Sequence, residues 1–216
     1  SRNFATGNGG NIFVETNDFN IIGGVERAGF LLTRTGGIGR GGSISINTST
    51  FTLQNGGSLA SSVTQSSGSS GDITINATEA VNLIGAEDNS PFTTLIGASA
   101  TGGTGDAGNV IITTPKLTLS NGAIISSSTF DAGNAGSIKI NASESVEIGG
   151  SRLNSQAEQE FSKIRSSAPL LSPVFRQIFG VPDTVTGNAG TIEINTPSLK
   201  VEDGALVTVR HDSLGD

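Results

Sequence analysis

The stretch that decides the fold is GNAGSIKINA (residues 133–142), because the chain repeats it almost unchanged as GNAGTIEINT (residues 187–196). Each copy has two glycines, three positions apart, and then alternating isoleucines. Successive side chains of a β-strand point to opposite faces, so this alternation predicts a short strand with one apolar face. Two near-identical copies in one chain indicate a repeat protein.

Further copies define the repeat. The motif Gly-x-x-Gly-x-(Ile/Val)-x-(Ile/Val) occurs six times, and each copy is followed by a second alternating strand, such as LTLS from Leu117 or VEIG from Val146. A third strand follows after a corner, which in alternate copies is Asn55-Gly56, Asn121-Gly122 or Asp203-Gly204. These dipeptides tolerate the positive φ of a tight turn. The second glycines of the motif are Gly10, Gly42, Gly71, Gly108, Gly136 and Gly190.

Three short strands per repeat of roughly 30 residues are typical of one turn of a solenoid, because such strands persist only when they stack on neighbouring turns. The sequence therefore predicts an all-β fold: a right-handed parallel β-helix of about six three-stranded turns, in three sheets, with residues 1–216 as one segment. The handedness follows from the general preference of parallel crossovers. The first, third and fifth copies carry insertions, all expected at one corner.

The largest insertion, residues 151–182, is predicted to be a small helical insertion between strands of the fifth turn. NSQAEQEFSKIR from Asn154 has apolar residues at helical spacing, and SPVFRQIFG places Pro173 at a helix start. One hypothesis is that both helices pack on the solenoid. The other is a docking surface for a partner chain or glycan, since aromatic residues and arginine are enriched in binding hot spots. Its candidate residues are Phe161, Arg165, Phe175, Arg176 and Phe179.

A polar position follows the first strand of every copy, and four of its six residues are asparagine. We expect these side chains to form a structural ladder of stacked amides, since buried polar groups need partners; a ligand-binding row is the alternative. The ladder residues are Asn47, Asn76, Asn141 and Asn195.

Composition narrows the functional classes. The chain has no cysteine, a net charge of −7 and no basic stripe, which disfavours a thiolate metal site and nucleic-acid binding. No apolar run approaches the roughly 20 residues of a membrane span. Carboxylates do not stack on adjacent turns as a glycosidase or a calcium-dependent lyase requires. The sequence thus predicts no catalytic residues, no metal site and no cofactor.

GNAGSIKINASESVEIGG and KLTLSNGAIISSSTFDAGNAG resemble the repeat region of filamentous-haemagglutinin-like exoproteins, many of which leave bacteria by two-partner secretion. The resemblance covers nearly the whole chain outside residues 151–182. It implies a secreted or outer-cell-surface location and an outer-membrane transporter as partner of the parent protein. We expect this chain to be an internal fragment of that protein.

Two functional hypotheses follow. The first is a structural shaft segment of a large, adhesin-like exoprotein that presents edge loops for adhesion to a surface glycan or protein receptor. The alternative is a carbohydrate-active β-helix, either a polysaccharide lyase or hydrolase or a glycan-binding module.

Overall fold

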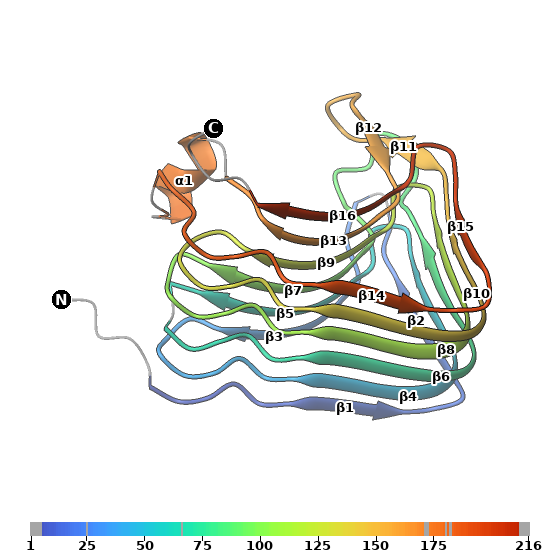
Figure 1. Ribbon diagram of the computed structural model, residues 1–216, viewed down its shortest axis with the longest axis horizontal. Helices are drawn as coiled ribbons and strands as arrows, with labels where there is room; N and C mark the ends of the chain where they lie inside the picture. The colour runs from blue at the N-terminus through green and yellow to red at the C-terminus, as the bar shows by residue number, and fades with distance from the viewer. Residues whose placement is uncertain are drawn as a thin grey trace.

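The computed structural model describes residues 6–211 except 25, 66, 171–172, 180 and 182, and only the backbone of 175 and 179. The chain is a parallel β-helix of six turns, as predicted (Figure 1). Turns one to three contain β1 (Ile12–Glu15), β2 (Asp18–Ile22) and β3 (Phe30–Thr35); β4 (Ile44–Gln54) and β5 (Ser58–Thr64); β6 (Ile73–Ile84) and β7 (Leu95–Thr101). Turns four to six contain β8 (Val110–Ser120) and β9 (Ile124–Thr129); β10 (Ile138–Ile148), β11 (Ser151–Leu153), β12 (Gln159–Phe161) and β13 (Lys163–Ala168); α1 (Pro173–Phe179), β14 (Ile192–Asn195), β15 (Leu199–Val201) and β16 (Leu206–His211).

The turns form two parallel sheets, whereas the sequence predicted three. Sheet A has the order β1-β4-β6-β8-β10-β14, with β2 beside β4 and β15 beside β10; sheet B has the order β3-β5-β7-β9-β13-β16. The first and second predicted strands are fused in the four middle turns, where one long strand bends at a register shift such as that between Ala142 and Ser145. A threonine hydroxyl holds two of these bends: that of Thr48 donates to the carbonyl of Thr50 over 3.0 Å, and that of Thr114 to the carbonyl of Lys116 over 3.1 Å.

The apolar core fills the space between the two sheets. Ile138, Ile140, Val146 and Ile148 are each at most 1% exposed, while Lys139 points outward into solvent. The in/out register read from the alternation is therefore confirmed. Burial of such side chains drives folding, at roughly 25 cal/mol per Å² of apolar surface removed from water.

Close backbone approach explains the paired glycines of the motif. A Cβ added to Gly108 would collide with the carbonyl oxygen of Gly71, and one added to Gly136 with that of Gly108. The first glycines stack in the same way, as Gly133 does on Gly105. This corner, which we call the glycine corner, therefore excludes a side chain at the motif glycines of turns two to six, whereas a Cβ at Gly7 or Gly10 of turn one would meet no neighbour.

The predicted helix from Asn154 is wrong. The segment forms an antiparallel hairpin, β11–β12, and then β13, the strand that completes the fifth turn in sheet B. Asn154 caps the hairpin loop, because its Oδ1 accepts hydrogen bonds from the N–H groups of Gln156 and Glu158, each 2.9 Å long. Ile164 is buried in the core at strand spacing, so the apparent helical spacing was coincidental.

The second predicted helix is confirmed as α1, the single helix among the described residues. It lies between β13 and β14, after the strand of sheet B rather than before it. The hairpin and α1 consequently occupy opposite ends of the sheet B strands (Figure 1). The expectation that every insertion falls on one corner is therefore wrong for this segment.

Candidate functional site

The corner between sheet A and sheet B alternates between tight turns and longer segments. In the even turns the chain reverses through two residues of positive φ, such as Asn121 at 53° and Gly122 at 79°. In the odd turns it makes longer excursions, which are residues 23–29, 85–94 and 149–162. We call this the edge corner, and the last two excursions together the edge ridge.

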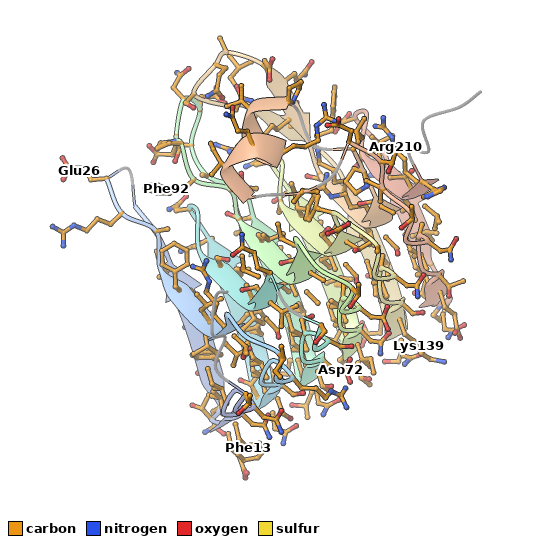
Figure 2. The ribbon with its side chains drawn as sticks, turned by 90° about the vertical axis from the view of Figure 1, so that its left-hand side faces the viewer. Phe13, Glu26, Asp72, Phe92, Lys139 and Arg210 are labelled. Atoms are coloured by element: carbon orange, nitrogen blue, oxygen red, sulfur yellow. The ribbon has the colours of Figure 1, made fainter. Side chains whose placement is uncertain are left out.

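The longer segments fold over the glycines of the neighbouring tight turns. A Cβ on Gly56 would collide with the side chain of Phe92 (in view in Figure 2), and one on Gly204 with the ring of Phe161. At Gly122 a Cβ would lie 3.0 Å from Cγ of Arg152. Glycine at these turns therefore provides room for the ridge as well as tolerance of positive φ.

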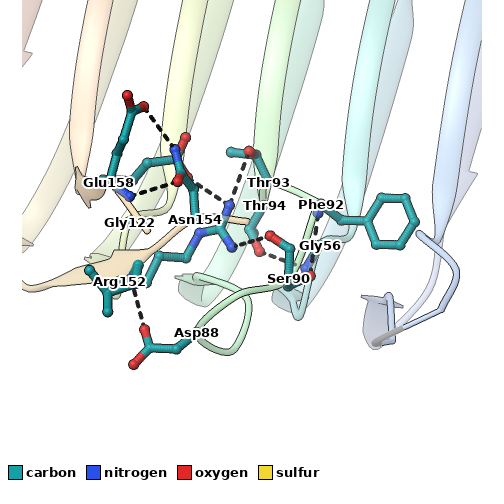
Figure 3. A network of polar contacts seen from close by, with 12 residues as sticks. Gly56, Asp88, Ser90, Phe92, Thr93, Thr94, Gly122, Arg152, Asn154 and Glu158 are labelled. Atoms are coloured by element: carbon teal, nitrogen blue, oxygen red, sulfur yellow. Dashed lines mark hydrogen bonds and ion pairs between the residues drawn. The ribbon is translucent and has the colours of Figure 1, made fainter. Parts of the chain in front are cut away.

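Arg152 ties the ridge together. Its side chain is 3% exposed, and its Nη2 lies 2.6 Å from Oε2 of Glu160 on the other strand of the hairpin. From the hairpin the guanidinium reaches across turn four to the loop of turn three, where Nη1 donates to the carbonyl of Ser90 over 3.0 Å and Nη2 to Thr93 Oγ1 over 3.3 Å (Figure 3). A buried arginine thus holds two excursions in one rigid ridge.

Backbone contacts reinforce this link. The N–H of Leu153 donates to Oδ1 of Asp88 over 2.8 Å (Figure 3). The N–H of Asn89 donates to the carbonyl of Leu153 over 2.8 Å. The hairpin therefore behaves as an edge strand docked on the loop of turn three. The ridge spans three turns and projects from the shaft.

Of the predicted docking residues, the three whose side chains are described do not form one surface. Phe161 packs over Gly204 at the edge corner, and Arg165 lies on the outer face of sheet B. Arg176 lies on α1, where its Nη1 is 3.2 Å from Oδ1 of Asp183. The side chains of Phe175 and Phe179 lie outside the described residues.

The predicted asparagine ladder is discontinuous. Asn76 Nδ2 donates to Asn47 Oδ1 over 2.9 Å, and Asn195 Nδ2 donates to Asn141 Oδ1 over 3.0 Å. Thr113 of turn four separates the two pairs in the register. All of these amides are at least partly exposed, so they form two surface pairs rather than a buried ladder.

This row of asparagines borders shallow grooves along the bend of sheet A. One groove of about 430 Å³ includes Asn141 and Asn195, and another of about 580 Å³ includes Asn47. Their walls are mostly threonine, serine and asparagine, and Glu15 is the one carboxylate among the described lining residues. We call these the axial grooves.

The sequence interpretation missed a buried hydroxyl column on the inner face of sheet B. Ser127 Oγ donates to the carbonyl of Gly108 over 2.9 Å and accepts from the N–H of Gly136 over 2.8 Å, bridging two turns of the glycine corner. Ser61 and Ser166 bridge in the same way. Where Ala98 interrupts the column, Ser70 accepts from Gly108 instead, over 2.7 Å.

A second missed column follows the motif glycines on the outside. Asp106 Oδ1 accepts from the N–H of Asn134 over 2.7 Å, and Asn134 Oδ1 accepts from the N–H of Asn188 over 3.0 Å. A parallel column follows the second motif glycines. There Asp72 Oδ1 accepts from the N–H of Asn109, and Asn109 Oδ1 accepts from the N–H of Ser137. The signal in the sequence is the Asn, Asp, Ser or Thr that follows most motif glycines.

Cationic side chains gather on the outer face of sheet B. Lys163 and Arg165 lie on β13, and neither forms an ion pair within the described part of the chain. Burial lowers the pKa of Lys163, and the neighbouring Arg165 lowers it further. Burial likewise lowers the pKa of Arg165, whereas Glu160 opposes this shift. Burial of these two side chains therefore disfavours their charged forms.

The carboxylates are scattered. Burial raises the pKa of Asp131, partly opposed by hydrogen bonds from the N–H groups of Ala132 and Gly103. Across residues 6–211, with the gaps given above, no three His, Asp or Glu side chains are placed to hold a metal ion. No described helix has the length and apolarity that a membrane crossing requires.

Comparison with known proteins gives no relative: no family model, curated protein or solved structure matches this chain.

Proposed function

We propose that this chain is a structural shaft segment of a large, adhesin-like exoprotein, secreted or displayed on the outer cell surface, whose edge ridge is presented for adhesion. Three features support the proposal: a uniform shaft, a rigid projecting ridge, and the resemblance of the repeat to filamentous-haemagglutinin-like exoproteins. By that resemblance, the partner of the parent protein during export is an outer-membrane transporter.

The observation that carries the proposal is the uniform stacking of the glycine corner. From the second turn on, each turn places its motif glycines on those of the preceding turn, and hydroxyls or amides bridge the turns at this corner. Such stacking makes each turn depend on its neighbours, as in other solenoids. A rod built in this way extends by adding turns and holds its edge segments at a fixed distance.

A glycan-binding module is the second candidate, favoured by the axial grooves. The groove beside Asn47 presents hydroxyl and amide groups that match the hydrogen-bonding groups of a sugar chain, whereas the groove beside Asn141 and Asn195 presents mainly apolar surface. Glycoside hydrolysis uses two carboxyl groups flanking the scissile bond. The described linings supply one, Glu15, so binding has more support here than hydrolysis.

Antibodies raised against the purified chain test the location and the exposure of the ridge. We expect them to label intact cells that express the parent protein. Pre-absorption with a peptide cyclised to match residues 149–162 should remove part of the labelling. Labelling that requires permeabilised cells would refute the proposal.

A further inference from the structure

The outer face of sheet B contains a depression beside Arg165. One row across the turns runs Leu32, Ala60, Gly97, Ser126, Arg165 and Thr208 in register. Its two smallest residues, Ala60 and Gly97, are adjacent and leave a hollow of about 240 Å³. Arg165 and Phe130 also line the hollow, which we call the sheet B pocket.

The arginine reaches into this pocket from two turns away. Its Nε donates to Ser126 Oγ over 3.2 Å, so the side chain crosses the strand between β13 and β7. Arg165 lines the hollow together with Gly97 of turn three. A guanidinium without an ion pair within the described residues is here presented as a planar pair of donors, the geometry that matches a carboxylate or sulfate.

The walls of the pocket differ in chemistry. On one side is the apolar side chain of Leu95. On the other is the half-buried Ser99 hydroxyl. Ser128 also lines the pocket, but it is 3% exposed and its Oγ is already engaged by the Oγ atoms of Ser126 at 2.7 Å and Ser167 at 3.0 Å. An apolar wall, an aromatic ring and a hydroxyl suit a pyranose ring, which has an apolar face and a polar edge. The volume is below the roughly 300–1,000 Å³ of a complete small-molecule site, so it suits one ring of a longer chain.

The positive charge around the sheet B pocket favours an acidic sugar over a neutral one. The chain carries a net charge of −7, so its overall field repels anions. Lys163 and Arg165 nevertheless place two cations on this face at a desolvation cost. Glu160, which acts on both, is already bound to Arg152 at 2.6 Å. The local field of the pocket is therefore suited to an anionic group.

We propose that the sheet B pocket binds one acidic ring of an anionic oligosaccharide, with Arg165 holding its carboxylate or sulfate and the Ser99 hydroxyl contacting its polar edge. This binding activity goes beyond the structural role of the shaft. It depends on the proposed function only for the location, the outer cell surface, at which the protein would encounter the oligosaccharide. Binding to the purified chain and surface labelling of cells can therefore succeed or fail independently.

The test uses the full chain and three probes: trigalacturonic acid, a sulfated disaccharide and neutral galactotriose. Titration by calorimetry or by amide chemical shifts gives each Kd. We expect at least one acidic probe to bind at least tenfold more tightly than galactotriose, and the two acidic arms show whether carboxylate or sulfate is preferred. Equal affinity for the neutral sugar, or no acidic binding at millimolar concentration, overturns the proposal.

Variants assign the binding to the pocket. Arg165→Gln should weaken acidic binding at least tenfold. Ala60→Leu should do so by filling the hollow while leaving every charge in place, which keeps the test valid if Arg165→Gln fails to fold. The control is Lys116→Gln, an equal charge change on sheet A, where Lys116 pairs with Glu144 at 3.3 Å. If Lys116→Gln weakens binding as much as Arg165→Gln, the attraction is non-specific and the proposal is wrong.

Discussion

The glycine corner and the edge corner solve the same problem, turning the chain between sheets, under different constraints. At the glycine corner the backbones of neighbouring turns touch, so a Cβ on Gly108 would collide with Gly71. At the edge corner a tight turn at Asn121-Gly122 alternates with a fourteen-residue excursion, residues 149–162. The difference shows that one corner sets the period of the shaft, while the other accepts variation in length.

A substitution at the glycine corner should have the largest effect. Gly108→Ala forces the stacked backbones apart, which should destabilise the chain by about 3 kcal/mol, the upper end for overpacking. Chemical denaturation measures the loss. The control is Gly97→Ala on sheet B, where the nearest contact of the new Cβ is the flexible Leu95 side chain at 3.3 Å. Equal losses at the two sites would show that backbone stacking does not set the period.

The hydroxyl column should contribute more to the free energy of unfolding than the asparagine row. Ser127→Ala leaves the N–H of Gly136 and the carbonyl of Gly108 without their buried partner, which should cost about 1–3 kcal/mol. Asn76→Ala removes an exposed amide pair and should cost less than about 0.5 kcal/mol. Thermal unfolding of the two variants ranks them. The opposite order would restore the asparagine row as the main support between turns.

The ridge should be held by its buried ion pair. Glu160→Gln leaves the guanidinium of Arg152 without a counter-charge at 3% exposure, although Glu160 itself is 24% exposed. We expect a loss of about 1–2 kcal/mol, below the 3–5 kcal/mol of a fully buried pair. Hydrogen exchange should show the loss at the amides of Leu153 and Asn89. Unchanged protection of these two amides would show that the ion pair does not hold the ridge in place.

The smallest expected effect is a local pKa change. The pKa of Glu193 lies below its usual value, mainly because Asn195 donates a hydrogen bond to it over 2.8 Å and secondly because Lys139 does so over 2.9 Å. Asn195→Ala should therefore raise the Glu193 pKa, measured by carboxyl NMR titration. Asn76→Ala, a change in the other amide pair, should leave it unchanged. A shift in both variants would argue for a continuous amide ladder.

Much of the fold was readable from local pattern. The alternation around Ile138 and Ile140 fixes the in/out register, and the Asn-Gly dipeptides fix the tight turns. A helix was wrongly predicted from Asn154, because Ala157, Phe161 and Ile164 also fit helical spacing. The strand β13 forms there because it pairs with β9 of the preceding turn, a contact that the local sequence does not reveal. The fusion of the first and second strands in sheet A was likewise not predicted, because a strand that bends while its pairing continues carries no turn residues in its sequence.

The candidate sites were less readable. Arg165 was selected by residue type, but its pocket depends on the alignment of Gly97 two turns away and Ala60 three turns away. The buried, bridging role of Arg152 could not be predicted, because its partners Ser90 and Thr93 lie roughly sixty residues earlier. Such contacts follow from the registration of whole turns and cannot be read from any single segment.

One measurement tests most directly the claim that the shaft is independent of its edge segments. Residues 149–162 are replaced by Ser-Asn-Gly-Ala, the connection that residues 120–123 make in turn four, and circular dichroism and denaturation are recorded. We expect the strand spectrum to persist and the stability to fall by about 1–3 kcal/mol. The contacts of Arg152 and Leu153 with the loop of turn three and the cover of Gly122 and Gly204 are lost, whereas the core and the glycine corner are unchanged. A chain that no longer folds would contradict the account.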